Sequence, residues 1–239
     1  MIAPVVAGVT IAGVALHGVY HRNSPIFGRA LASLPHSGKQ VALTFDDGPN
    51  PDATPRILDE LAAAQVKATF FLLGRHVEKW PEIARRVATD GHAIGNHGYF
   101  HRKLHVHGPA YVRMDLTKGT EAIERATGVK PRLFRAPHGF RSPWVTSIAA
   151  SLGQRTVGWS LGVWDSDRPG AEVIAKRTID GTRPGSILLL HDGDGYDING
   201  DRTQTAQAIP SIVKTLLNQG YTFVPVPPAP VLRSTRTEG

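Results

Sequence analysis

The sequence contains no cysteine among its 239 residues. Disulfide bonds and thiolate metal sites are therefore excluded, and a bound metal ion would have to be held by histidine, aspartate or glutamate side chains. A cysteine-free chain suits a reducing cytosol and a disulfide-free bacterial exterior equally, so the absence does not distinguish between these compartments.

Clusters of basic residues are absent as well, although 27 lysines and arginines outnumber 20 acidic residues and give a net charge of +7. Scattered basic residues do not form the stripe that binds a nucleic acid, so we expect no nucleic-acid partner. The net charge would favour anionic surfaces such as envelope polymers or phospholipids. No glycine-rich phosphate loop follows any predicted strand, which disfavours a nucleotide-binding protein.

A long apolar run opens the chain, from Ile2 to Tyr20. It is about long enough to cross a bilayer as a helix, and we predict a membrane anchor over residues 2–20. A cleaved signal peptide is less favoured because no basic residue precedes the run, and a buried amphipathic helix is the third alternative. Arg22 and Arg29 follow the run. By the positive-inside rule they would place the rest of the chain in the cytoplasm, but the side of the membrane stays open.

Residues 39–226 alternate short apolar runs with segments of helical periodicity, and 41% of the whole chain is hydrophobic. This alternation predicts one α/β domain, preceded by an N-terminal segment and linker (1–38) and followed by a mobile tail (227–239). A distorted (β/α) barrel and a doubly wound sheet both fit the pattern. The predicted strands are 41–45, 68–73, 92–94, 133–134, 156–159, 187–190 and 222–224. The predicted helices are 54–65, 81–90, 111–127, 143–152, 171–179 and 203–218. Glycines placed to form left-handed helix caps are Gly91, Gly128, Gly153 and Gly220.

Polar side chains that suit catalysis follow one predicted strand after another. In parallel α/β folds the C-terminal ends of the strands meet at one edge, where reactive groups gather. Each group alone is explained as well by a turn or a helix cap, but their repetition at successive strand ends favours a site. The residues concerned are Asp46, Asp47, Asn96, His97, Arg135, His138, Asp165, His191 and Asp192.

Two of these residue types, aspartate and histidine, suit a metal ion. Two adjacent carboxylates need separate partners, so a metal on one of Asp46 and Asp47 would leave the other free as a base. His97 and His101 are four residues apart, a spacing that can place two imidazoles on one ion. His105 continues the same spacing and makes the register ambiguous, but His97 ends a strand and is therefore preferred. Two histidines and one aspartate leave an open position, as hydrolytic metals need.

His191 follows an apolar strand and would place an imidazole at its mouth, where it can act as a general acid. The acidic loop after it fails the EF-hand pattern and is predicted to be a flexible loop at the rim of the site. The remaining histidines are expected to have ordinary structural or surface roles: His17, His21, His36, His76, His92 and His107.

Four short motifs connect these residues in sequence order: Thr44-Phe-Asp-Asp-Gly-Pro49, His97-x-x-x-His101, Arg135-x-Pro-x-Gly139 and Leu189-x-His191. Together they resemble the polysaccharide deacetylase (NodB homology) domain, carbohydrate esterase family four. The first motif is a highly specific element, and the resemblance extends from about Lys39 to Pro225.

The resemblance implies a distorted (β/α) barrel of about seven parallel strands with the active site at their C-terminal ends. It implies a metal-dependent hydrolase that removes N-linked or O-linked acetyl groups from an amino sugar or glycan. Asp47, His97 and His101 would bind one divalent ion, most often Zn²⁺, with Co²⁺, Ni²⁺ or Mn²⁺ as alternatives. The catalytic residues would be Asp46 as general base held by Arg135, and His191 as general acid tuned by Asp165. Residues for the substrate and the oxyanion would be His138, Gly139 and Trp164.

The chain departs from the family pattern at several places. Gly98 replaces a serine or threonine whose hydroxyl would steady the metal-binding loop, and His138 replaces an aromatic residue. The fourth motif matches least well, because Gly162 and Ser166 stand where the family often has Asp and Trp. Substrate specificity is therefore less defined than the reaction.

Two other functions are compatible with these motifs. One is a deformylase or amidase acting on a lipid-linked or small-molecule substrate, and the other is a non-catalytic carbohydrate-binding relative. The expected location is the bacterial cell envelope, with a carbohydrate or glycolipid substrate and membrane association through residues 2–20.

Overall fold

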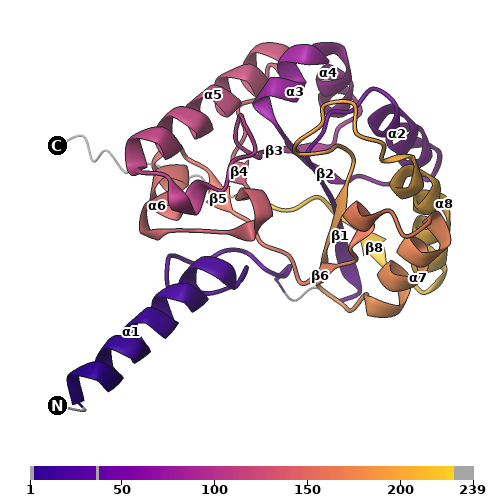
Figure 1. Cartoon of the computed structure of the whole chain (residues 1–239). Helices are drawn as coiled ribbons and strands as arrows, with labels where there is room; N and C mark the ends of the chain where they lie inside the picture. The colour runs from indigo at the N-terminus through magenta and orange to yellow at the C-terminus, as the bar shows by residue number, and fades with distance from the viewer. Residues whose placement is uncertain (1–2, 36–37, 229–239) are drawn as a thin grey trace, which may run out of the picture.

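The computed structural model describes residues 3–35 and 38–228, with side chains from residue 12 onward. At the centre of this part of the chain lies an eight-stranded parallel sheet that curls into an open barrel (Figure 1). The strand order is β5-β4-β3-β2-β1-β7-β6, and β8 pairs with β1. The strands are β1 (Gln40–Asp46), β2 (Thr69–Leu72), β3 (Ala93–Asn96), β4 (Leu133–Phe134), β5 (Arg155–Thr156), β6 (Leu161–Gly162), β7 (Ile187–His191) and β8 (Thr222–Phe223).

Helices cover the outside of this barrel, and α1 projects away from it (Figure 1). The helices are α1 (Ala3–Tyr20), α2 (Ala53–Ala63), α3 (Gly74–Lys79), α4 (Pro81–Thr89), α5 (Pro109–Thr127), α6 (Pro143–Ser151), α7 (Ala171–Gly181) and α8 (Thr203–Asn218). Three short 3₁₀ turns are η1 (Leu104–Val106), η2 (Pro137–Gly139) and η3 (Asp165–Asp167). The distorted (β/α) barrel predicted above is confirmed, and the doubly wound alternative is wrong.

Local signals fix most helix ends. Proline begins α4, α5 and α6, where its missing N–H removes no intrahelical bond. The predicted left-handed glycines are confirmed, with φ values of 79°, 73°, 75° and 80° at Gly91, Gly128, Gly153 and Gly220. Helix α3 and strand β6 were not predicted, because six and two residues are too short to show a periodic pattern.

The alternation of side chains along β1 determines which of them face the inside of the barrel. Val41, Leu43 and Phe45 are fully buried between the sheet and the outer helices. Successive residues of a strand point to opposite faces, so Thr44 and Asp46 lie on the inner face. Their neighbour on that face is the fully buried Arg135, whose Nη1 donates to both of them. The same strand therefore builds the core outside and the site inside.

The apolar run that opens the chain forms α1 (Figure 1). Among the residues whose side chains the structure describes, no helix is long and apolar enough to cross a membrane. The membrane anchor predicted over residues 2–20 is thus not supported, and the first part of that range lies outside the described side chains. All of the predicted tail (227–239) except residues 227 and 228 also lies outside the described residues.

The end of the predicted N-terminal segment (1–38) contributes to the barrel wall. Leu31 forms a parallel bridge to Val157, and Ser33 forms an antiparallel bridge to Ser186. The N–H of Leu31 donates to the Thr156 carbonyl at 3.0 Å, and the Leu31 carbonyl accepts the N–H of Gly158 at 2.9 Å. Because β5 and β6 do not pair with each other, this segment fills the gap between the two ends of the curled sheet.

Buried Arg141 fastens this segment to the barrel. Its Nη1 donates to the Gly28 carbonyl at 2.9 Å, and its Nη2 donates to the carbonyls of Arg22 and Ser24 at 3.2 and 2.6 Å. We expect Arg141→Met to lower the free energy of unfolding by about 2–4 kcal/mol, because one buried and two partly buried carbonyls lose a charged donor. Chemical denaturation measures this loss, and trypsin should cut faster after Arg22. The exposed Arg113→Met is the matched control, and equal stability of the two variants would contradict the assigned role.

Candidate active site

The acidic pair at the end of β1 separates into two environments. Asp46 ends the strand, and its Oδ1 accepts a hydrogen bond from Arg135 Nη1 at 2.7 Å. The other oxygen, Oδ2, lies 3.8 Å from His97 Nε2. Arg135 is itself fixed, because Nη1 also donates to Thr44 Oγ1 and Nη2 donates to the Gly158 carbonyl. One oxygen of Asp46 is thus held in place and the other faces the site.

Asp47 leaves the strand in the left-handed region, with φ of 72°, so its side chain points elsewhere than that of Asp46. Its carbonyl lies 2.7 Å from Nδ1 of His76, a residue of α3 that is fully buried. Hydrogen bonding to a carbonyl requires the proton on Nδ1. His76 thereby holds the backbone of Asp47, a structural role beside the site. No sequence pattern indicated this contact, because the short helix that contains His76 was itself not predicted.

Asp47, His97 and His101 come together as one buried group, and their possible ligand atoms all lie within 4.8 Å of one another. Asp47 Oδ1 is 3.3 Å from His97 Nε2 and 3.2 Å from His101 Nε2. His97 Nδ1 lies 2.9 Å from the Arg135 carbonyl, which places the proton on Nδ1 and leaves the Nε2 lone pair facing Asp47.

The donor set fits a divalent metal ion. Asp47 Oδ1 is buried without a hydrogen-bond partner among the described residues. A buried carboxylate oxygen that lies between two imidazoles and has no hydrogen bond is well suited to coordinate a metal ion. His105, the alternative in the spacing pattern, instead packs edge-on against Tyr20 and Phe140. The structure therefore resolves the register in favour of His97 and His101.

The electrostatics keep Asp47 and His101 in their metal-binding forms, whereas at His97 the lowering of the pKa by burial is outweighed by Asp46 and Asp47, which raise it. Burial alone would raise the pKa of Asp47, but the neighbouring His101 and His97 reverse this effect and hold the pKa below its ordinary value. Burial is also the main cause that lowers the pKa of His101 to about 3. An ionised carboxylate and a neutral imidazole are the forms that bind metal, so no proton has to be displaced from them at neutral pH.

His191 ends β7 directly opposite Asp46 in the strand register. Its Nδ1 is 2.9 Å from Oδ1 of the buried Asp165, and its backbone N–H donates to Oδ2 of the same residue at 2.7 Å. Thr205 in α8 adds a hydroxyl donor to Asp165 Oδ2 at 2.9 Å. Burial would lower the pKa of His191, but Asp165 outweighs it and raises the pKa to about 9. The imidazole is therefore protonated at neutral pH. No sequence pattern pointed to this role of Thr205.

A cavity of about 600 Å³ joins these groups. Three of the sequence-predicted strand-end residues do not line its wall. Arg135 lies beneath Asp46, Asn96 donates to the Leu116 carbonyl, and Asp192 accepts a hydrogen bond from Thr54. The wall residues predicted from sequence are Asp46, Asp47, His97, His101, His138, Gly139, Trp164, Asp165 and His191.

Aromatic side chains stand at the rim of the cavity. Trp164 is 70% exposed and Tyr196 is 67% exposed, and both line the opening. The Tyr196 hydroxyl lies 3.1 Å from Nε2 of His138, whose backbone is left-handed with φ of 60°. The N–H of Gly139 already donates to the Ala136 carbonyl. Because Gly139 has no side chain, the ring of Trp159 can pack closely against it at the rim.

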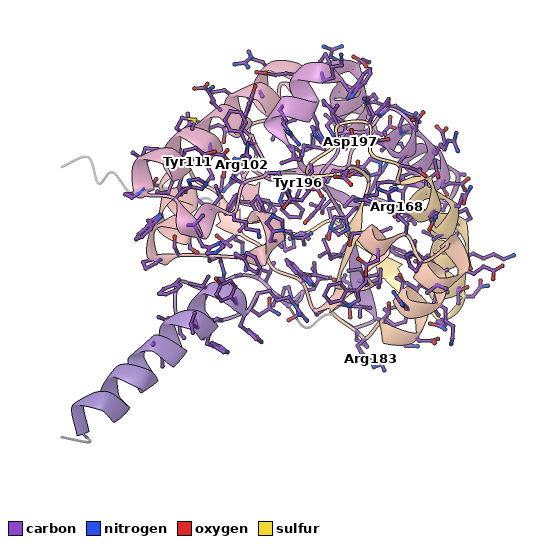
Figure 2. The ribbon with its side chains drawn as sticks, in the orientation of Figure 1. Arg102, Tyr111, Arg168, Arg183, Tyr196 and Asp197 are labelled. Carbon is purple, nitrogen blue, oxygen red and sulfur yellow. The ribbon has the colours of Figure 1, made fainter. Side chains whose placement is uncertain are left out.

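The acidic loop after His191 is held over the site, and Figure 2 shows Tyr196 above the middle of the barrel. Arg202 Nη2 binds Asp194 Oδ2 at 2.8 Å, and Arg75 Nη2 donates to the Gly195 carbonyl at 2.7 Å. Gly195 packs so closely on His101 that a Cβ there would lie 2.1 Å from Nδ1. The loop predicted to be a flexible rim is thus tied down at several points.

The unusual Gly98 has a structural reason. Its φ is 82°, and a Cβ would lie 2.5 Å from Oδ2 of Asp115. This fully buried carboxylate of α5 accepts the N–H groups of Tyr99 and Phe100 at 3.0 and 3.1 Å. Asp115 therefore steadies the loop between the two metal-binding histidines, a role that the sequence analysis expected to be lost with the missing hydroxyl.

Comparison with known proteins agrees with this geometry. Residues 33–157 match the family described as polysaccharide deacetylase. The chain belongs to this family. It is 34% identical over 209 residues to the chitooligosaccharide deacetylase of Azorhizobium caulinodans, an alignment covering 84% of this chain and 99% of that protein.

Solved polysaccharide deacetylase structures share the fold. A peptidoglycan N-acetylglucosamine deacetylase superposes with a TM-score of 0.76 at 35% identity, covering 83% of this chain and 91% of that one. A carbohydrate esterase family four pseudoenzyme from Bacillus anthracis superposes with a TM-score of 0.73 at 31% identity, covering 80% of this chain and 65% of that one.

Proposed function

We propose that this polysaccharide deacetylase hydrolyses N-acetyl groups on amino sugars of bacterial envelope glycan. The observation that carries the proposal is the pairing of two fixed proton-transfer groups across one metal-binding triad. Asp46 is held by Arg135 on one side, and His191 is held by Asp165 on the other. The fold alone would not suffice, because a pseudoenzyme shares it.

Asp47, His97 and His101 would hold the divalent ion in this protein. Two nitrogen donors and one oxygen donor suit Zn²⁺, with Co²⁺, Ni²⁺ and Mn²⁺ as the alternatives to be tested. When bound, such an ion polarises the acyl oxygen and lowers the pKa of a water molecule. We infer that the remaining chemistry is carried out by side chains of this chain.

Asp46 acts as general base through Oδ2, taking a proton from the water that adds to the acyl carbon. Arg135 holds the opposite oxygen, so the carboxylate does not have to reorient during the reaction. His191 donates its Nε2 proton to the sugar nitrogen as the carbon–nitrogen bond breaks, releasing acetate and a free amine. Asp165 keeps the His191 proton in place, and the backbone N–H of His138 is our proposed donor to the developing oxyanion.

The rim supports a carbohydrate substrate. Trp164 and Tyr196 present exposed ring faces on the cavity wall. Aromatic faces pack well against the apolar faces of pyranose rings, while a polar tip can bond to hydroxyls. The relatives are named for chitooligosaccharide and peptidoglycan, both of which carry N-acetylglucosamine units. We therefore place the activity at the cell envelope and expect a neutral amino sugar at the reacting position.

The function is tested on the full chain by measuring acetate and formate release. The substrates are acetylated chitooligosaccharides, peptidoglycan and N-formylglucosamine. Acetate release that stops on chelation and returns with Zn²⁺ or Co²⁺ supports the proposal. Release of formate only would favour the deformylase. Binding of the glycans without release of either acid would identify a non-catalytic carbohydrate-binding relative.

The alkaline limb of the pH profile reports on His191. This residue must be protonated to act as an acid, so kcat/KM should fall as pH rises through about 9, the raised pKa of its imidazole. Asp165→Asn removes the charge that raises this pKa, and the limb should move at least about one pH unit lower. The exposed Asp167→Asn is the control and should leave the limb in place. An unmoved limb in Asp165→Asn would remove His191 from the mechanism.

A further inference from the structure

Arg22 lies on the wall of the active-site cavity, together with Asp46 and Trp159. It belongs to the segment that follows α1 and precedes the family match, which begins at residue 33. The cavity of this protein is therefore completed by a residue that lies outside the matched part of the domain. A fragment that starts after residue 35 would lack it, as well as the bridges formed by Leu31 and Ser33.

The exposed Arg22 side chain lies against Trp159. Its Nε donates to the Trp159 carbonyl at 3.4 Å, and its guanidinium carbon lies 5.7 Å from the centre of the Trp159 ring. The neighbouring Asn23 donates to the same carbonyl at 3.0 Å. From the other side, buried Arg141 holds the backbone carbonyl of Arg22. These contacts restrict Arg22 to the mouth of the cavity and leave its two terminal nitrogens available.

The Arg22 guanidinium has no acidic partner within the described part of the chain. Two neighbouring arginines do have such partners: Arg202, which also lines the cavity, pairs with Asp194, and Arg135, which lies beneath the wall, pairs with Asp46. An unpaired guanidinium with a planar pair of donors suits a carboxylate or a phosphate group, which it can bind with two parallel hydrogen bonds.

We propose that Arg22 is a specificity-determining residue that binds an anionic substituent, a carboxylate or a phosphate, on the sugar unit adjoining the acetylated one. The inference rests on the proposed function, because it assumes that an amino sugar occupies the cavity. The reacting sugar unit is neutral and binds beside Asp47, His97 and His101. Arg22 selects for the anionic substituent on the adjoining sugar unit.

The test compares three probes on the full chain. The neutral probe is N,N′-diacetylchitobiose, the carboxylate probe is the N-acetylglucosamine–N-acetylmuramic acid disaccharide, and the phosphate probe is N,N′-diacetylchitobiose 1-phosphate, whose phosphate is on the adjoining unit. Arg22→Gln should lower the ratio of kcat/KM on a charged probe to that on the neutral probe about fivefold. The wild-type preference should also weaken as salt concentration rises, because the contact is solvent-exposed. The charged probe for which Arg22→Gln lowers this kcat/KM ratio identifies the anion that Arg22 binds.

Arg29→Gln is the matched control, since it removes the same charge from the same segment at a position outside the cavity wall. Calorimetric binding of the same probes to the Asp46→Asn variant, with and without Arg22→Gln, separates recognition from turnover. If the wild type releases no acetate but Arg22→Gln still weakens charged-probe binding, the proposed function fails and the role of Arg22 stands. A ratio that Arg22→Gln leaves unchanged for both charged probes, or that Arg29→Gln lowers equally, overturns the inference.

Discussion

Asp46→Asn should lower kcat for acetate release about 10³-fold while the protein keeps its metal ion. The amide can still accept the hydrogen bond from Arg135, so the geometry at the end of β1 is retained. It cannot take a proton from water, and a positioned general base contributes about 10²–10⁴ to the rate. Steady-state kinetics on an acetylated chitooligosaccharide, with elemental analysis of the same preparation, measures both quantities.

The matched control for this variant is Asp52→Asn, which changes an exposed carboxylate shortly after the same motif. Its kcat should stay within about twofold of the wild type. Turnover by Asp46→Asn within tenfold of the wild type would show that another group is the base. Loss of the metal ion would show that Asp46 Oδ2, 3.8 Å from His97 Nε2, is a ligand as well.

His101→Ala should remove the metal ion and lower acetate release by about 10³-fold or more. With one imidazole gone, Asp47 and His97 offer only two protein ligands, fewer than the three of a hydrolytic site. The loss should be seen as a metal content well below one ion per chain and as activity that added Zn²⁺ or Co²⁺ does not restore. In the wild type, by contrast, chelation should be reversed by either ion.

His105→Ala is the informative control, because His105 has the same four-residue spacing in the sequence. It packs against Tyr20 and Phe140 rather than beside Asp47, so its removal should leave the metal content unchanged. If His105→Ala lost the ion and His101→Ala kept it, the assignment of the metal-binding register would be wrong.

Local sequence patterns determined most of the fold. Gly91, Gly128, Gly153 and Gly220 cap the expected helices because the left-handed region is accessible to glycine at little cost. The buried strands were recognised as continuous apolar runs, which suit a parallel sheet covered on both sides. Polar groups at strand ends were expected to meet, since parallel strands place their C-terminal ends at one edge. This reasoning brought Asp46, Asp47, His97 and His191 together correctly.

The supporting contacts could not be read from the sequence in the same way. His76 holds Asp47, Asp115 holds the loop after His97, and Thr205 holds Asp165, each across a long separation in the chain. Such contacts produce no repeating pattern in the sequence, because each needs only one residue with a suitable hydrogen-bonding group at one position. The spacing alone did not separate His101 from His105, and the preference for His101 came from the strand end at His97 and from the family resemblance.

The sequence by itself indicated the class of chemistry, because polar groups recur at strand ends and the motifs from Thr44 to His191 resemble those of the polysaccharide deacetylase domain. The tertiary structure alone decided what surrounds that chemistry. It showed that the segment before residue 35 completes the barrel wall and brings Arg22 to the cavity, beside Trp159. The physical reason is that a curled sheet leaves a gap between its two edge strands. Which segment of the chain fills that gap is decided only when the sheet has folded into the barrel. No local pattern of residues records that closure.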